Sequence, residues 1–121
     1  MNATGNNPVI ENRIHSNNEI LHFTFKGRFT ESDARNAVLQ WNDSLRKGDA
    51  KLHHIWDCRE MSGYDPMARI EWQKAIKELK NRIEKIWLIS DSSLIIAGAM
   101  ILSTFTTLEI KAVKSEEQVS F

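Results

Sequence analysis

Hydrophobic and polar residues follow one another along this chain with the periods of short strands and amphipathic helices. Two strands are predicted at residues 9–15 and 20–26, and Leu21, Phe23 and Phe25 alternate on one face of the second. A turn-forming Ser-Asn-Asn-Glu stretch separates the strands, so the pattern predicts a hairpin with one buried face. Mainly apolar runs predict three further strands, at 53–57, 85–90 and 107–113.

Helix starts are marked by capping residues ahead of apolar positions at helical spacing. Thr30 followed by Asp33 has the spacing of a helix cap with an acidic first turn. Asp65 and Pro66 suit the cap and first position of a second helix, and the serines of 90–93 suit the cap of a third. The helices are predicted at 31–47, 66–82 and 94–105, with a last short helical turn within 115–121.

The resulting order is β-β-α-β-α-β-α-β plus a short C-terminal helix, which predicts an α/β fold. Strand-helix-strand connections imply parallel neighbouring strands, while the opening hairpin adds an antiparallel edge. We therefore expect one mixed sheet covered by helices. With 121 residues the chain is the size of a single domain, and its small, polar residues 1–8 are expected to form a disordered tail.

Composition excludes several classes of protein. Lys plus Arg total 16 against 16 Asp plus Glu, so no basic field is present to attract nucleic acid. Cys58 is the only cysteine, which excludes an internal disulfide and fits a reducing cytoplasm. The N-terminal residues lack the pattern of a signal peptide, and the apolar run of 94–105 is far shorter than the ~20 residues that cross a bilayer. We expect a cytoplasmic protein without membrane insertion.

The stretch 55–70 is the predicted functional region. It has the pattern of a buried strand that runs into a loop and then a helix start, where outward-pointing amides suit an anion or a partner. Asp65 is expected to cap this helix and to pair with Arg69, four residues later.

Residues with metal-binding or nucleophilic side chains also occur near this strand. Imidazole, carboxylate and thiolate all bind zinc, but on a strand His53 shares a face with Asp57 while His54 shares the other with Cys58. Neither face has three ligands, so no metal site is expected. Cys58 has no activating histidine in the sequence pattern and is interpreted as a structural thiol. The sequence predicts no catalytic residue and no cofactor, and the four tryptophans are expected in the core.

The order of elements, and certain residues within it, resemble the STAS family of anti-sigma factor antagonists, in particular its SpoIIAA-like, STAS/SEC14 group. The likeness covers residues 19–121. Residues 25–30 with Asp33 resemble the family's strand that ends in a glycine before a capped helix. Residues 56–57 and 63–65 resemble the strand whose loop leads to the regulatory helix, and 115–117 are similar to the family's closing segment.

One departure from the family pattern affects the expected switch. STAS antagonists carry an Asp-Ser-Ser-Gly-Leu type of motif whose serine is phosphorylated by a partner kinase. Asp65 matches the aspartate of that motif, but Pro66 and Met67 replace its hydroxyl residues. The usual phosphoacceptor is therefore missing.

Three hydroxyl residues remain candidates for phosphorylation. Ser62 and Tyr64 stand beside the helix start, where amides would stabilise a phosphate, although the interpretation as plain loop residues is favoured. Ser92 belongs to an Asp-Ser-Ser-Leu run, but that run follows a different strand and is interpreted as a helix cap.

The resemblance implies a non-enzymatic bacterial signalling domain that docks to a regulatory protein, such as an anti-sigma factor or a kinase-like protein. The alternative is a carrier of a small apolar ligand or lipid, of SEC14-like type, because the helix at 94–105 is unusually apolar. Gly98 and its flanking alanines would let that helix pack closely on the sheet or on a second subunit, so a homodimer stays open. The expected partner contacts are Met61, Ser62, Gly63, Tyr64, Asp65 and Arg69.

Overall fold

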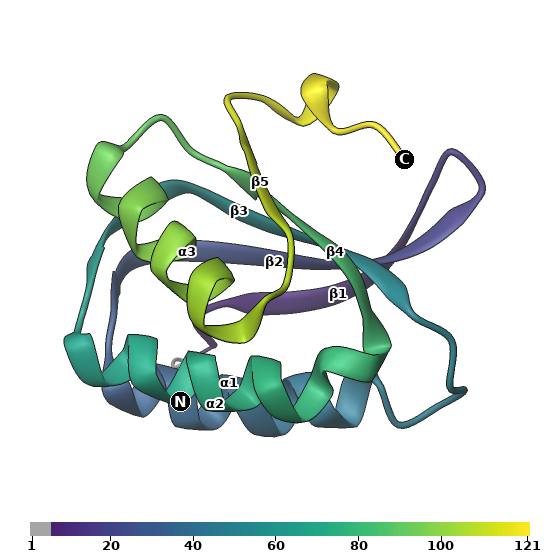
Figure 1. Cartoon of the computed structure of the whole chain (residues 1–121), viewed down its shortest axis with the longest axis horizontal. Coiled ribbons are helices and arrows are strands. Elements are labelled where there is room, and N and C mark those ends of the chain that lie inside the picture. Colours follow the sequence, from purple (N-terminus) through teal and green to yellow (C-terminus); the bar gives the residue numbers. More distant parts are fainter. Residues whose placement is uncertain (1–5) are drawn as a thin grey trace.

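The computed structural model describes residues 6–121 of the chain. Five strands form one sheet in the order β1-β2-β3-β4-β5 (Figure 1). The first two strands are antiparallel, and the remaining neighbours are parallel. This confirms the predicted mixed sheet with an antiparallel edge. The strands are β1 (Val9–His15), β2 (Asn18–Phe29), β3 (Leu52–Tyr64), β4 (Ile83–Ile89) and β5 (Ile110–Val113).

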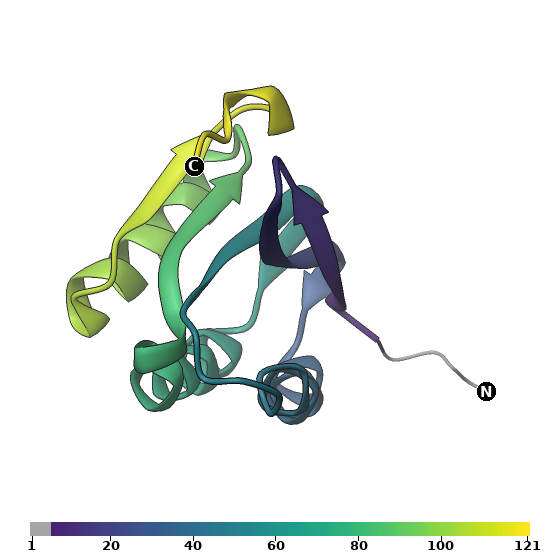
Figure 2. The ribbon, with the colours of Figure 1, turned by 90° about the vertical axis from the view of Figure 1, so that its right-hand side faces the viewer.

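The three predicted helices are present and share one face of the sheet. Their buried side chains join those of alternate strand positions, such as Phe23 and Leu88, in one large apolar core. Figure 2 shows α1 and α2 beside each other below the sheet, with the C-terminal segment at the opposite end. The helical elements are α1 (Glu31–Ser44), α2 (Pro66–Leu79) with a following 3-10 turn η1 (Lys80–Arg82), α3 (Ser93–Thr106) and the 3-10 turn η2 (Glu116–Gln118).

The other face of the sheet has a smaller core that the pattern of the hairpin did not indicate. The hairpin was expected to bury one face only, yet Ile20 and His22 of β2 are buried as well as Phe23. The reason is tertiary: the C-terminal segment folds back across this face, where Val119 joins Ile20 and Trp87 in a second apolar cluster.

β3 runs much further than predicted. Its polar second half was expected to be a loop, but Met61 pairs with Gly27 and Tyr64 pairs with Phe29 of β2. Two register irregularities allow this pairing to continue past the part of β3 that also pairs with β4. The predicted loop is therefore strand up to Tyr64, and α2 begins two residues later.

Part of the expected disordered tail, within residues 6–8, is in contact with the sheet. Residues 1–5 of that tail lie outside the described part of the chain, whereas Pro8 is buried. The Asn7 side chain donates to the Lys26 carbonyl at 2.8 Å and accepts from the Lys26 amide at 2.9 Å. An amide side chain thus pairs with β2 much as another strand residue would, which fixes the start of β1.

Candidate functional site

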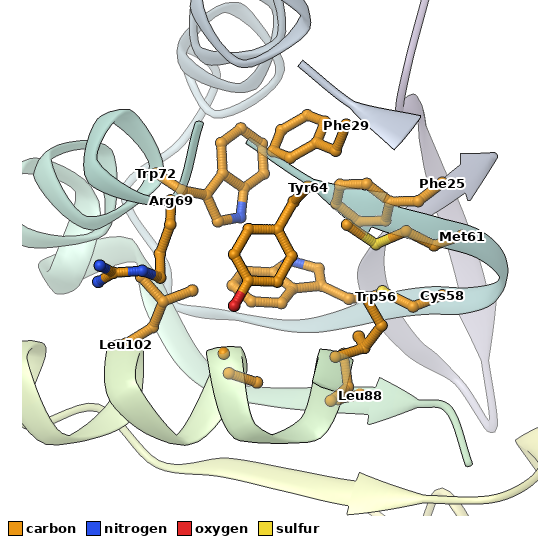
Figure 3. Close-up of a pocket in the computed structure, with 13 residues that line it drawn as sticks. Phe25, Phe29, Trp56, Cys58, Met61, Tyr64, Arg69, Trp72, Leu88 and Leu102 are labelled. Carbon is orange, nitrogen blue, oxygen red and sulfur yellow. The ribbon is translucent and has the colours of Figure 1, made fainter. Parts of the chain in front are cut away.

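An apolar cavity of about 50 Å³ lies between the sheet, α2 and α3 (Figure 3). Aromatic rings from β2, β3 and α2 form its inner wall, and α3 closes the opposite side with small and aliphatic residues. Three residues of the predicted contact set line it: Met61, Tyr64 and Arg69. The structure therefore gathers part of the predicted site around a cavity rather than on a protruding loop.

The inner wall is rigid because it belongs to a continuous aromatic cluster. Trp72 of α2 is buried, and its ring lies 4.9 Å from that of Trp41 and 5.1 Å from that of Phe29, measured between centroids. Trp56 of β3 lies 6.0 Å from Trp72. All four tryptophans are buried, as the sequence predicts, and Trp87 lies on the opposite face of the sheet.

Tyr64 occupies the centre of the site, between β3 and α3 (Figure 3). A Cβ atom placed on Gly98 would lie 2.5 Å from the Tyr64 hydroxyl oxygen and 2.9 Å from its Cζ atom. Only glycine fits at this position without moving the tyrosine ring. The sequence left open whether Gly98 packs closely on the sheet or on a second subunit. The structure shows that it packs against Tyr64 of β3.

The polar groups around the cavity are few. Trp56 Nε1 is buried and has no hydrogen-bond partner within residues 6–121. The half-buried Arg69 lines the cavity from α2 and forms no ion pair with any residue that the structure describes. Burial raises the pKa of the Cys58 thiol, which stays protonated and unreactive at neutral pH. The cavity thus offers an apolar interior whose polar groups include the Arg69 guanidinium, the Tyr64 hydroxyl and the unpaired Trp56 Nε1.

Asp65 occupies the N-cap position of α2, as predicted, but its side chain makes no hydrogen bond to that helix. Its carboxylate accepts a 2.7 Å hydrogen bond from Arg28 Nε and a 3.2 Å bond from the Glu31 amide in the first turn of α1. The bond from Arg28 holds the pKa of Asp65 below its ordinary value. The expected pair with Arg69 is wrong, because β2 brings Arg28 closer than the next turn of α2 could bring Arg69.

The remaining predicted contact residues have different exposures. Ser62 is exposed on β3, whereas Gly63 is buried beside Arg28. Ser92 accepts a hydrogen bond from the Ile95 amide at 3.4 Å, so its interpretation as the cap of α3 is confirmed. Phosphorylation of Ser62, Tyr64 or Ser92 stays a prediction.

His53 and His54 lie on opposite faces of β3, as strand geometry predicts. Trp41 Nε1 donates to His54 Nε2 at 3.1 Å, and burial lowers the pKa of His54 to about 4. His53 instead packs against Phe121, with ring centroids 4.5 Å apart. The cavity-lining role of Trp56 and Trp72 was missed, because a core position and a cavity wall have the same apolar pattern.

Comparison with known proteins finds a matching family and a similar fold. A family model described as SpoIIAA-like matches residues 20–119. An uncharacterized protein of the DUF3478 family from Shewanella loihica PV-4, described as having a SpoIIAA-like fold, superimposes with a TM-score of 0.76 at 16% identity. The match covers 92% of this chain and 89% of that one. No protein of curated function matches the chain in sequence.

Proposed function

Because the chain belongs to the SpoIIAA-like family, we propose that it is a non-enzymatic binding domain whose pocket takes a small amphipathic ligand. This function corresponds to the ligand carrier that was the alternative in the sequence analysis, rather than to docking to a regulatory protein. The observation that supports it is the cavity between β3, α2 and α3, whose interior is apolar and whose charged lining residue is Arg69.

The chemistry of the cavity favours a particular kind of molecule. An apolar chain or ring suits the aromatic wall, and an anionic group such as a carboxylate suits the guanidinium of Arg69. Trp56 Nε1 can donate to a further oxygen. A volume of about 50 Å³ holds only a few carbon atoms, so a larger ligand requires α3 to move away from the sheet.

Titration with decanoate and with decanol tests this proposal. We expect decanoate to quench the fluorescence of the pocket tryptophans and to bind more tightly than decanol. Arg69→Gln should weaken decanoate binding about tenfold and leave decanol binding unchanged, because it removes one charge-assisted hydrogen bond. Lys74→Gln, an exposed cation on the same helix, is the matched control. Equal losses in both variants, or no saturable binding, would refute the ligand and its orientation.

Docking to a regulatory protein is the second candidate, and the surface beside the pocket supports it. Met67 at the start of α2 is 45% exposed, and Leu94 and Phe105 of α3 are each 59% exposed. No charged residue occurs in α3. Ser62 lies exposed on the strand that leads to this surface. A second copy of the chain could cover the same side chains.

A Met67→Asp variant separates docking from ligand binding. We expect it to lose an affinity-purified partner, identified by mass spectrometry, because the new charge would be buried in the contact. Leu39→Asp on the exposed side of α1 should keep that partner. Gel filtration of both variants and of the unmodified protein shows whether the chain forms a homodimer and whether Met67→Asp disrupts it. Equal recovery of the partner by both variants contradicts a contact at Met67. Asp65 is unsuitable for this test, because its change would release Arg28 and α1.

A further inference from the structure

A polar cluster lies on the face of the sheet opposite the pocket. His22 of β2, Asp57 of β3 and Glu116 of η2 each contribute one potential ligand atom, and these atoms lie within 4.8 Å of one another. Glu116 arrives there because the C-terminal segment, yellow in Figure 1, turns back after β5. The three residues come from distant parts of the chain.

His22 indicates what this cluster can bind. Its side chain is only 3% exposed, and Nε2 has no hydrogen-bond partner within residues 6–121. Nδ1 lies 3.4 Å from Thr24 Oγ1, and Nε2 lies 3.8 Å from Glu116 Oε1. In the tautomer in which Nδ1 donates to Thr24, Nε2 carries the lone pair that a metal ion needs. In metal sites, a hydrogen bond from the ring nitrogen that does not bind the metal fixes the orientation of the histidine ligand.

The charge states of the three groups also suit a cation. Burial, reinforced by Arg13, lowers the pKa of His22, which is therefore neutral at pH 7. Burial of Asp57 alone would raise the pKa of that carboxyl, but hydrogen bonds from Arg59 outweigh this effect and keep it ionised. Glu116 is half-exposed and lies on a three-residue turn that can adjust its position.

We propose that His22, Asp57 and Glu116 bind one divalent transition-metal ion of the Zn²⁺ type, with water at the remaining positions. Imidazole nitrogen and carboxylate oxygen are both ligands that this class of ion accepts, at about 2.0–2.2 Å from the metal. The ion would tie the C-terminal segment to β2 and β3.

Arg59 would compete with the metal ion for the carboxylates of Asp57 and Glu116. Its Nε and Nη2 atoms donate to Asp57 at 2.9 and 2.7 Å, and Nη2 lies 3.6 Å from Glu116. The guanidinium thus neutralises the carboxylates that the metal would use. Because the Arg59 side chain is half-exposed, it can leave toward solvent when the ion binds.

Zn²⁺ titration of the metal-stripped full chain by calorimetry, followed by Co²⁺ absorption spectra, tests the site. We expect one ion per chain, and Glu116→Gln should weaken binding by about tenfold or more. Glu117→Gln, an exposed neighbour on the same turn, should bind as the unmodified protein does. Arg59→Gln should strengthen binding, because the competing cation is gone. His22→Gln should abolish the nitrogen-ligand features of the Co²⁺ spectrum.

Several outcomes would overturn the proposal. Equal affinity of the Glu116 and Glu117 variants would mean adventitious surface binding only. Weaker binding after Arg59→Gln would mean that Arg59 supports the site rather than competing for it. Absence of saturable binding by the unmodified protein would leave the cluster as an ion-pair network that holds the C-terminal segment.

Discussion

Lowering the pH from 7 to 4 is expected to reduce the free energy of unfolding by about 3 kcal/mol through His54 alone. Its pKa is lowered from 6.5 to about 4 by burial in the folded protein. Protonation of Nε2 would also direct an N–H group against the N–H of Trp41. Between pH 6.5 and pH 4 the unfolded chain therefore binds more protons than the folded chain. The free energy of unfolding keeps the full contribution of neutral His54 above pH 6.5 and falls as the pH is lowered toward 4.

Urea denaturation at a series of pH values measures this effect. His54→Gln should remove most of the loss, since its amide oxygen can still accept from Trp41 but does not titrate. His22 and His53, whose pKa values are also lowered by burial, add a smaller loss of the same sign in both proteins. Leu39→Ala, which changes an exposed residue without a titratable group, is the control and should keep the full pH dependence. An unchanged slope in the His54 variant would contradict the assignment to that residue.

Trp72→Ala is expected to destabilise the protein by about 3–5 kcal/mol, the range for removing a large buried aromatic side chain. Trp72 touches the rings of Trp41, Phe29 and Trp56, so no single neighbour can collapse into the space. It also forms the wall of the pocket on the α2 side, and its loss should abolish decanoate binding.

Thermal and urea unfolding check the Trp72 prediction. Trp72→Phe should cost less, because a six-membered ring still fills part of the site. Leu39→Ala, at an exposed position of α1, should change stability by no more than about 0.5 kcal/mol. A loss below about 1 kcal/mol for Trp72→Ala would show that the aromatic cluster rearranges to fill the cavity.

The fold was predictable because most elements carry a local signal. The Thr30 cap, confirmed as a capping box with Asp33, and the alternation of Leu21, Phe23 and Phe25 require nothing beyond neighbouring residues. The second half of β3 lacks such a signal. Its pairing depends on bulges against β2, which a pattern of side chains does not record.

The site was predictable only in part for the same reason. Met61, Tyr64 and Arg69 were found because they lie near a helix start, but their pocket depends on Gly98, which is distant in sequence. Strand spacing excluded a metal site within β3, yet the candidate ligand His22 belongs to β2 and Glu116 to the C-terminal turn. The carboxylate of Asp65 likewise binds α1, because only the folded chain brings Arg28 beside it.

Tyr64 and Asp65 are consecutive residues with contacts on different sides of the protein. The ring of Tyr64 presses on α3 at Gly98, and the carboxylate of Asp65 holds Arg28 and the first turn of α1. The main-chain carbonyl of Tyr64 also accepts a hydrogen bond from Arg28 at 3.3 Å, so both residues of this dipeptide are tied to the same guanidinium. This dipeptide therefore joins the packing of α3 on the apolar core to the ion pair that connects β2 with the starts of α1 and α2.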